Sequence, residues 1–373
     1  MSETTREFGE WPLKRLMTEV CGSGPKSADD MDRDQAREAF QRILAGEPDP
    51  TTLGAFWLAN RWKRNTPEEL GAYVDVMCDR VEYAQPDADP VDCGANYDGK
   101  GRSAILGVAA GAVAAAAGTP VVVHSGDRVP TQKQDSYKHV LDELGVHTEL
   151  TPGDSAEMVD ETGFGFYYQP AFNPAIDDLF DRRDMMGVRT FVNTIETLAN
   201  PAGASVHLGS FYHLAFAKKV VDTFVESEFH DLDRVLMFQG MEGYDDVRPG
   251  YTKVAEWDAA SGSDGEGESA DGDAAGSEGA SFDDFEIETA EYGMDLEEAD
   301  LAVDDVAVDS ARITEEVLSG ERDDAFADAV AVNAALRIYA REDADSIEEG
   351  LDAAREAIDD GSAMAVLEDL RAF

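Results

Sequence analysis

Short apolar runs that alternate with helical stretches constrain the fold of this chain more than any other feature of its sequence. The stretches Thr131–Leu144 and His213–Phe224 are predicted helices, and each lies between two apolar runs. The apolar runs, each a predicted strand, are 120–125, 164–168 and 234–238. Because parallel strands are joined by helical crossovers, this order predicts a mainly parallel central sheet with helices on both faces, an α/β fold.

The residues before Pro90 predict helices and no strand. Residues 27–50 carry apolar side chains at helical spacing, and Thr66–Glu69 forms a capping box with proline at the first helical position. We therefore expect an N-terminal helical domain at 1–85 and a larger α/β domain at 86–373.

The segment 258–281 has an unusual composition, because it contains only Asp, Glu, Ala, Ser and Gly. Without an apolar anchor such a segment does not recover its ordering entropy, so we predict a disordered acidic loop. The sequences on either side of it read as strands, which makes it a long excursion within a hairpin. The tail at 309–371 is again predicted to be helical.

The charge of the chain excludes some partners. The sequence holds 79 acidic residues against 30 Lys and Arg, a formal net charge of −49 at pH 7. Such an excess is typical of a halophilic protein, since the Debye length falls to about 3 Å at 1 M salt and self-repulsion is then screened. It argues against nonspecific binding to nucleic acid or to an anionic membrane, both of which need a basic surface.

Three cysteines, Cys21, Cys78 and Cys93, are too few and too scattered for a disulfide framework or a zinc site. The N-terminus shows no signal pattern. The most apolar run, Ala104–Ala117, is too short to span a bilayer. These observations predict a cytoplasmic protein with reduced thiols.

The stretch 91–107, "VDCGANYDGKGRSAILG", has the form of a phosphate-binding loop, with an apolar run, a glycine-bearing turn and the start of a helix. The surrounding segment 100–138 also keeps more bases than acids, unlike the rest of the chain. The five bases are Lys100, Arg102, Arg128, Lys133 and Lys138, and the two acids are Asp127 and Asp135. Two glycine turns at the carboxyl ends of parallel strands would suit a phosphorylated ligand, although ordinary loops with surface bases remain an alternative.

Asp245 and Asp246 are adjacent carboxylates in a loop after the predicted strand 234–238. Mg²⁺ is usually held by one or two carboxylates together with substrate phosphates. In a sequence with so many acids, such a pair is by itself more often a solvated surface feature.

Four segments resemble motifs of the anthranilate phosphoribosyltransferase family, whose fold is shared with the pyrimidine nucleoside phosphorylases. The segment 181–204, "DRRDMMGVRTFVNTIETLANPAGA", is similar to the family's R-x-x-L-G-x-R-T-x-F-N and N-P-A motifs, and 237–257 resembles its G-x-D-E loop and the strand that follows. Residues 36–77 and 333–370 resemble its N-terminal helical module and its C-terminal helices.

This resemblance implies a Mg²⁺-dependent transfer of phosphoribosyl from phosphoribosyl pyrophosphate to an aromatic amine or heterocycle, with anthranilate and tryptophan biosynthesis as one case. By position in the family's motifs, the implied donor-binding residues are Gly94, Asp98, Gly99, Arg128 and Lys133, the implied acceptor-binding residues are Arg183 and Asn173, and the implied Mg²⁺ ligands are Asp245 and Asp246.

The phosphate loop departs from the family pattern. Asn96 and Tyr97 replace two glycines of the family's G-T-G-G-D-G motif, and they would crowd a pyrophosphate held by backbone N–H groups. Lys100 and Arg102 are predicted to compensate with charge, since a guanidinium binds phosphate bidentately. This form resembles a divergent branch of the family, some members of which are associated with nucleic-acid binding.

Three functions follow as alternatives. The first is a glycosyltransferase that works by positioning and charge neutralisation rather than through a covalent nucleophile. The second is a non-catalytic module that binds nucleic acid or a nucleotide, and the third is a regulatory relative that binds a phosphorylated ligand without turnover. The resemblance also implies a homodimer that pairs through the N-terminal helices.

Overall fold

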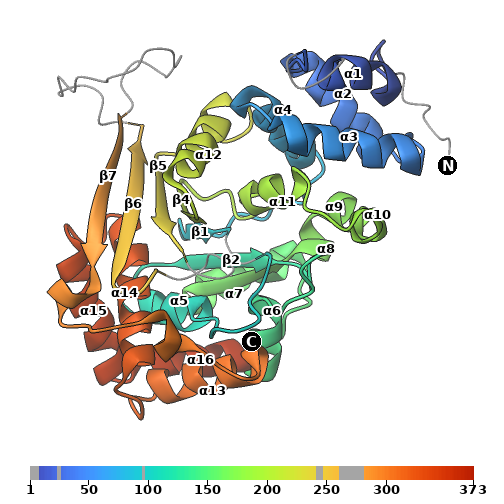
Figure 1. The fold of residues 1–373 in the computed structure, drawn as a ribbon. Helices are drawn as coiled ribbons and strands as arrows, with labels where there is room; N and C mark the ends of the chain where they lie inside the picture. The colour runs from blue at the N-terminus through green and yellow to red at the C-terminus, as the bar shows by residue number, and fades with distance from the viewer. Residues whose placement is uncertain (1–7, 23–26, 95–96, 241–246, 260–280) are drawn as a thin grey trace.

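A seven-stranded sheet with the order β3-β2-β1-β4-β5-β6-β7 runs through the centre of the molecule (Figure 1). The computed structural model describes residues 8–22, 27–94, 97–240, 247–259 and 281–373. The strands are β1 (Val91–Cys93), β2 (Val121–Ser125), β3 (Phe164–Tyr168), β4 (Val206–Phe211), β5 (Arg234–Gln239), β6 (Tyr251–Asp258) and β7 (Ser281–Glu288). The first five are parallel, and β6 and β7 add an antiparallel edge, so the predicted mainly parallel sheet is confirmed.

The strand order reverses direction at β1. From β1 the chain proceeds outward to β2 and β3, then returns to pair β4 with the other side of β1 and continues to β5. In open α/β sheets, the carboxyl ends of the two strands at such a reversal diverge and leave a crevice in which ligands bind. The fold therefore places a binding crevice beyond Cys93 and Phe211, where β1 and β4 end.

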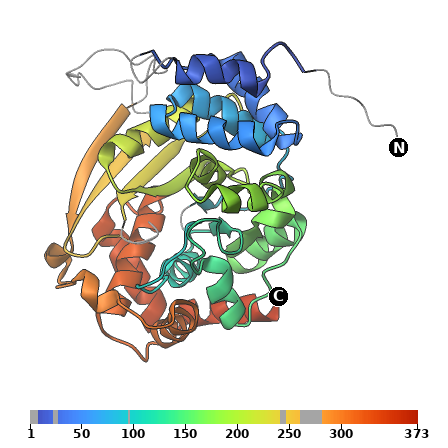
Figure 2. The same cartoon turned by 45° about the vertical axis from the view of Figure 1, so that its right-hand side comes forward.

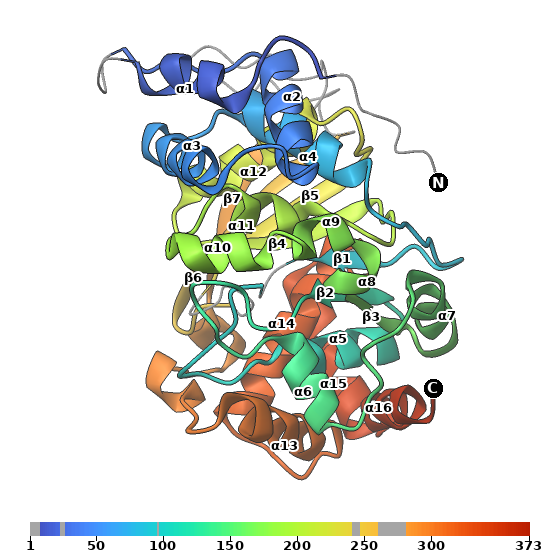
Figure 3. The same ribbon diagram turned by 90° about the vertical axis from the view of Figure 1, so that its right-hand side faces the viewer.

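Two hydrophobic cores cover the two faces of the sheet. One face packs against α5 and the C-terminal helices, which are drawn in orange and red in Figures 1 and 2. The other face packs against α4, α11 and α12, with the remaining N-terminal helices beyond them (Figure 3). The helices of the first face are α5 (Gly107–Ala116), α6 (Tyr137–Glu143), α13 (Val306–Leu318), α14 (Ala325–Ala340), α15 (Ile347–Asp359) and α16 (Ser362–Ala372). Helices on both faces were predicted, and this is confirmed.

The N-terminal module consists of α1 (Leu13–Cys21), α2 (Arg33–Leu44), α3 (Pro50–Lys63) and α4 (Pro67–Cys78). The predicted capping box at the start of α4 is present, because Thr66 accepts from the Glu69 amide while the Glu69 carboxylate accepts from the Thr66 amide. Tyr73 of α4 stacks on Phe191 with 4.2 Å between ring centroids. The module thus shares a hydrophobic core with the α/β part of the chain.

Short helices connect these layers. In chain order they are α7 (Pro152–Thr162), α8 (Gln169–Phe172), α9 (Pro174–Asp177), α10 (Phe180–Met186), α11 (Val192–Ile195), η1 (Glu196–Leu198), α12 (Leu214–Glu226), η4 (Thr289–Tyr292) and η5 (Glu298–Leu301). Within the described ranges, no helix is long and apolar enough to cross a membrane.

The predicted helix Thr131–Leu144 is wrong in its first half. The helix there, α6, begins only at Tyr137. Thr131 and Lys133 have φ angles of 82° and 54°, which a right-handed helix does not contain. The backbone amide of Lys100 donates to the carbonyl of Asp135, so this segment is held as a loop against the turn that follows β1.

The hairpin expected on either side of the acidic segment is confirmed. β6 and β7 pair antiparallel over their whole length, and Asp258 at the end of β6 lies opposite Ser281 at the start of β7. Apart from Ala259, the residues that connect the two strands lie outside the described residues. The predicted disorder of the acidic loop concerns these residues and stays a prediction.

We predict that the connection can be shortened to a tight turn. Because Asp258 and Ser281 are register partners, replacing residues 259–280 with Asn-Gly closes a two-residue hairpin without shifting the strands. Loop-closure entropy changes by only about 0.6 kcal/mol per doubling of length, so thermal unfolding in high salt should stay cooperative, with a similar or higher Tm.

The matched control keeps the full length but replaces the Asp and Glu residues of 260–280 with Asn and Gln, which separates the effect of charge from that of length. Aggregation or a non-cooperative melt of the shortened variant alone would show that the segment is structural.

Candidate active site

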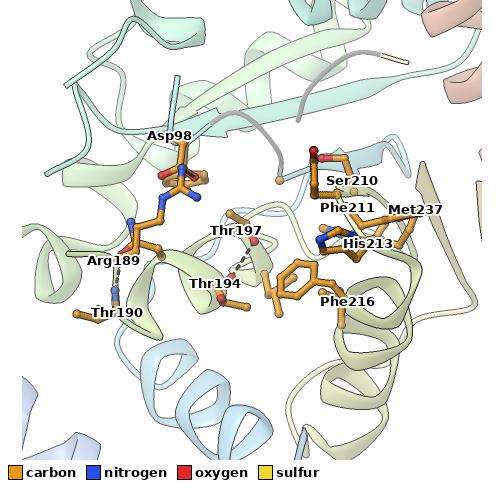
Figure 4. Close-up of a pocket in the computed structure, with 18 of the residues that line it drawn as sticks. Asp98, Arg189, Thr190, Thr194, Thr197, Ser210, Phe211, His213, Phe216 and Met237 are labelled. Atoms are coloured by element: carbon orange, nitrogen blue, oxygen red, sulfur yellow. Dashed lines mark hydrogen bonds and ion pairs between the residues drawn. The ribbon is translucent and has the colours of Figure 1, made fainter. Parts of the chain in front are cut away.

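A cavity of about 420 Å³ opens at the carboxyl ends of β1 and β4, where the strand order reverses. Figure 4 shows side chains from the turn after β1, from the segment before α11, from β4 and from the start of α12 around it. Its lining includes Gly94, Tyr97, Asp98, Arg189, Thr190, Asn193, Thr194, Thr197, His207, Gly209, Ser210, Phe211, His213, Phe216 and Met237. Small-molecule sites typically measure roughly 300–1,000 Å³, so one ring-sized ligand group fits this cavity.

Two of the predicted donor-binding residues, Gly94 and Asp98, line this cavity. Asp98 pairs with Arg189 at 2.7 Å between carboxylate oxygen and guanidinium nitrogen, across one end of the cavity (Figure 4). Burial raises the pKa of Asp98 above its ordinary value, and Arg189 opposes this shift.

The two glycines of the turn are packed against the protein's own backbone. A Cβ at Gly94 would lie 1.9 Å from the carbonyl oxygen of Thr197. Gly99 has a φ of +73°, and a Cβ there would lie 2.4 Å from the carbonyl oxygen of Asp135. Both positions therefore need glycine for close approach within the fold itself.

Tyr97 points into the protein rather than across the turn. Its side chain is buried, and its hydroxyl lies 2.6 Å from Nδ1 of His124. The other predicted obstacle in the turn, Asn96, lies outside the described residues.

The two bases predicted to compensate for the altered turn have different environments. Lys100 is only 1% exposed, and its ammonium donates to the carbonyl of Ala104 at 2.9 Å. Arg102 is exposed, and its carbonyl accepts from the amide of Val303. Neither side chain lines the cavity.

Arg128 and Lys133 each pair with a carboxylate. Arg128 lies 2.6 Å from Asp135, and Lys133 lies 2.8 Å from Asp184. Asp184 belongs to α10, more than fifty positions away from Lys133. Counting charge along 100–138 therefore missed an acid that the fold brings to these bases.

The predicted acceptor-binding residues, Arg183 and Asn173, are buried and do not line the cavity. Arg183 is buried, and its two guanidinium nitrogens donate to the two carboxylate oxygens of Glu196 at 2.8 and 2.6 Å. Glu196, fully buried, also accepts from Gln169. Asn173, which follows Gln169 closely in sequence, is fully buried. Its side-chain amide atoms have no hydrogen-bond partner among the described residues.

A polar row that no sequence motif indicated lies on the sheet beside the cavity. Asp92 on β1 lies between two imidazoles: its Oδ2 is 2.7 Å from Nδ1 of His207 on β4, and its Oδ1 is 3.2 Å from Nε2 of His124 on β2. Burial would raise the pKa of Asp92, but the two imidazoles hold it well below its ordinary value. The available signal was one ionisable residue in each of three otherwise largely apolar strands, "VDC", "VVVHS" and "VHLGSF".

The predicted Mg²⁺ ligands, Asp245 and Asp246, lie outside the described residues. Over the ranges that the structure describes, no group of three His, Cys, Asp or Glu side chains could hold a metal ion.

Comparisons with known proteins agree with this architecture. The family model described as the α/β domain of the glycosyl transferase family matches residues 98–364, and the model of its helical bundle domain matches residues 22–81. An anthranilate phosphoribosyltransferase of Methanocorpusculum labreanum is 30% identical over 95% of this chain and 97% of its own length. One of Natronomonas pharaonis is 28% identical over 92% of this chain and 96% of its own length.

Solved structures show the same likeness. The anthranilate phosphoribosyltransferase of Thermus thermophilus superposes with a TM-score of 0.76 at 25% identity, covering 96% of this chain and 98% of that one. The Saccharomyces cerevisiae enzyme, solved in complex with phosphoribosyl pyrophosphate and Mg, gives a TM-score of 0.75 at 17% identity over 96% of each chain, which is a likeness of fold. The chain therefore belongs to the anthranilate phosphoribosyltransferase family of glycosyl transferases, as its motifs predicted.

Proposed function

We propose that this protein transfers phosphoribosyl from phosphoribosyl pyrophosphate to the nitrogen of an aromatic amine or heterocycle, with Mg²⁺ bound to the donor's phosphates. The cavity at the reversal between β1 and β4 carries this proposal, because it combines Gly94 and Asp98 of the phosphate turn with an aromatic and hydroxyl-bearing wall. The curated relatives are named anthranilate phosphoribosyltransferase, which supports the reaction class.

The exposed ion pairs of Arg128 and Lys133, in the segment that follows β2, suit a phosphorylated donor. The side chains of Arg128 and Lys133 are 54% and 57% exposed, and exposed pairs are worth only about 0–1 kcal/mol. A pyrophosphate with several charges can replace Asp135 and Asp184 at little cost. Lys100 is buried, so we assign the donor contacts to Arg128, Lys133 and the exposed Arg102 rather than to Lys100.

Mg²⁺ would be held by Asp245 and Asp246, and it would neutralise charge on the departing pyrophosphate. The Saccharomyces cerevisiae relative was solved with both donor and Mg, which supports a requirement for Mg²⁺. Binding and orientation of the donor by the chain's own Arg and Lys side chains would supply the rest of the effect.

The acceptor that fits this cavity is a neutral ring. Arg183 is neutralised by the buried Glu196, and breaking a buried pair costs about 3–5 kcal/mol. The carboxylate of anthranilate therefore finds no free guanidinium at Arg183. Two guanidiniums do line the cavity, but Arg189 is paired with Asp98 and Arg61 donates to the carbonyl of Arg189. Aromatic side chains and hydroxyls such as Phe216 and Thr194 form much of the remaining wall, and they suit an uncharged aromatic acceptor.

The donor site is tested by titration with phosphoribosyl pyrophosphate in molar salt, with and without Mg²⁺. We expect Mg²⁺-dependent binding that Arg128→Ala weakens by about 1.5–3 kcal/mol, the size of a charged hydrogen bond. Asp245→Asn should abolish the increase in donor affinity that Mg²⁺ causes and leave the affinity without Mg²⁺ unchanged. Lys253→Ala is the matched control, because Lys253 forms a comparable surface pair with Asp284 away from the cavity. Binding of a single-stranded oligonucleotide in place of the donor, without Mg²⁺, would favour the nucleic-acid alternative.

The acceptor preference is tested with anthranilate and its neutral amide, 2-aminobenzamide. We expect the wild-type protein to release pyrophosphate faster with the amide. Glu196→Gln frees Arg183, so it should raise kcat/KM for anthranilate at least tenfold relative to the amide, while lowering Tm because a buried cation loses its partner. Glu256→Gln, which breaks the Arg234 pair elsewhere, should lower Tm without changing the preference. A wild-type preference for anthranilate that Glu196→Gln leaves unchanged would contradict this assignment.

We also propose that two copies pair through the α3 and α10 faces. Four large apolar side chains are exposed there: Leu58 at 48%, Trp62 at 79%, Met185 at 69% and Val188 at 38%. The two helices lie side by side, since Arg61 of α3 donates to the carbonyl of Arg189 just after α10 (Figure 3). Contiguous exposed apolar side chains of this kind mark interaction surfaces, and pairing of N-terminal helices is what the resemblance implies.

Light scattering after gel filtration in molar salt should give the mass of two chains. The double variant Trp62→Glu and Met185→Glu should give the mass of one, because it buries charge in the interface. Phe229→Glu, at another exposed aromatic that lies outside this patch, should leave the mass unchanged. A monomeric wild-type protein would contradict the proposal.

A further inference from the structure

The polar row on the sheet face beneath the N-terminal helices is built around one carboxylate. Asp92 and His207 are directly opposite each other in the β1–β4 register, and His124 lies two positions further along β2 than the partner of Asp92. All three side chains are 1% exposed or less. A buried charge of this kind is costly unless it is hydrogen-bonded or paired. The Asp92 carboxylate is hydrogen-bonded to His207, and its other oxygen lies 3.2 Å from Nε2 of His124 without hydrogen-bond geometry.

Of these three residues, only His207 lines the cavity. Its ring edge lies under two glycines that also line it. A Cβ at Gly94 would be 3.1 Å from Cε1 of His207, and a Cβ at Gly209 would be 3.0 Å from Nε2. A larger residue at either position would collide with this edge or with its neighbours, the carbonyl of Thr197 and the sulfur of Met237, so glycine lets the ring of His207 reach the cavity that it lines.

The hydrogen bond to Asp92 fixes the chemistry of that edge. With Nδ1–H donating to the carboxylate, a neutral His207 carries its lone pair on Nε2. An aspartate that holds Nδ1 in this way sets both the tautomer and the ring orientation, and it stabilises the imidazolium that forms when Nε2 takes a proton.

The proposed transfer reaction needs such a proton acceptor. As the bond from the acceptor nitrogen to the ribose carbon forms, the bond from that carbon to pyrophosphate breaks, and pyrophosphate leaves with the electron pair. The attacking nitrogen, bound to hydrogen in an aromatic amine or a ring N–H, then carries one proton too many. That proton must pass to a base, while its bonding electrons stay on nitrogen.

We propose that Nε2 of His207 accepts the proton of the attacking nitrogen and that Asp92 is the positioning residue that holds His207 for this step. This inference rests on the proposed function, since it assigns a base to that reaction. His213 also lines the cavity, but it is exposed at the start of α12.

A merely structural role for the row predicts a different pattern of losses. His124 contacts the other oxygen of Asp92, is equally buried and does not line the cavity, so it is the matched control. If the row only stabilises the sheet, His124→Ala and His207→Ala should lower Tm by similar amounts. The folded fraction of each variant should then have the same kcat as the other. If His207 is the base, only His207→Ala should lose kcat.

The test measures pyrophosphate release with phosphoribosyl pyrophosphate, Mg²⁺ and 2-aminobenzamide at saturation. His207→Ala should lower kcat on the order of 100-fold or more, the usual contribution of a general base, with KM nearly unchanged. Added imidazole should restore part of the loss in His207→Ala, because the removed ring leaves space beside the cavity, and should not act on His124→Ala.

The dependence of kcat on pH gives a second readout, which is measured on the folded variants in solution. We expect kcat to fall as pH drops, because the step needs an unprotonated base. Asp92→Asn removes the negative charge that favours the imidazolium, so the acid limb should move to lower pH by about one unit or more. Other titratable groups near His207 are His124 through Asp92, His230 across the ring of Phe224, and Asp98 and His213 in the cavity. His230→Asn and His213→Ala should leave the limb in place.

Three results decide the matter. Loss of kcat in His207→Ala with rescue by imidazole, together with the shifted limb of Asp92→Asn, supports the inference. An active wild-type protein whose kcat survives His207→Ala overturns the inference and leaves the proposed function standing. A folded wild-type protein that releases no pyrophosphate with anthranilate, 2-aminobenzamide or a ring N–H acceptor such as benzimidazole overturns the proposed function and this inference together.

Discussion

The structure depends on a buried carboxylate in the shortest strand of its sheet. β1 has only three residues, yet it lies inside the sheet, with β2 on one side and β4 on the other. Asp92 contacts an imidazole on each of these neighbours, so polar contacts between side chains add to the few backbone hydrogen bonds that so short a strand can form. Removing one partner would leave an uncompensated buried charge, which costs several kcal/mol, on the order of 3–5. The same contacts hold together the two strands whose diverging ends form the cavity.

Much of the fold could be predicted because the strands are locally encoded. The runs 120–125, 164–168 and 234–238 match β2, β3 and β5 closely, since strands buried on both faces read as continuous apolar stretches. The start of α4 was equally predictable, because Thr66, Pro67 and Glu69 satisfy its first amides through side chains next to them in sequence. The loop at 131–136 could not be predicted in this way. Its conformation is held by the bond from Lys100 to Asp135, a partner more than thirty positions away.

The site was predictable only where its residues follow a strand directly. Gly94 and Asp98 come just after β1, and they do line the cavity. Arg189, Thr194 and His207 come from segments about a hundred positions further along the chain, and no local pattern joins them to that turn. Charge was misjudged for the same reason: Arg183 reads as a free cation in sequence, whereas the fold pairs it with Glu196. A count of charge along a segment leaves out every partner that folding supplies.

The β6–β7 hairpin has a consequence for how this protein tolerates change. Asp258 and Ser281 face each other at the end of a fully paired ladder. The register of the two strands is therefore determined by the pairs within the ladder and not by the chain that joins the strands. Insertions and deletions between these two positions alter the length of a connection and leave every backbone hydrogen bond of the ladder in place. The hairpin tip is therefore a natural attachment point for a fluorescent label, an affinity tag or an inserted domain, and a place where relatives can differ in length without any adjustment of the sheet.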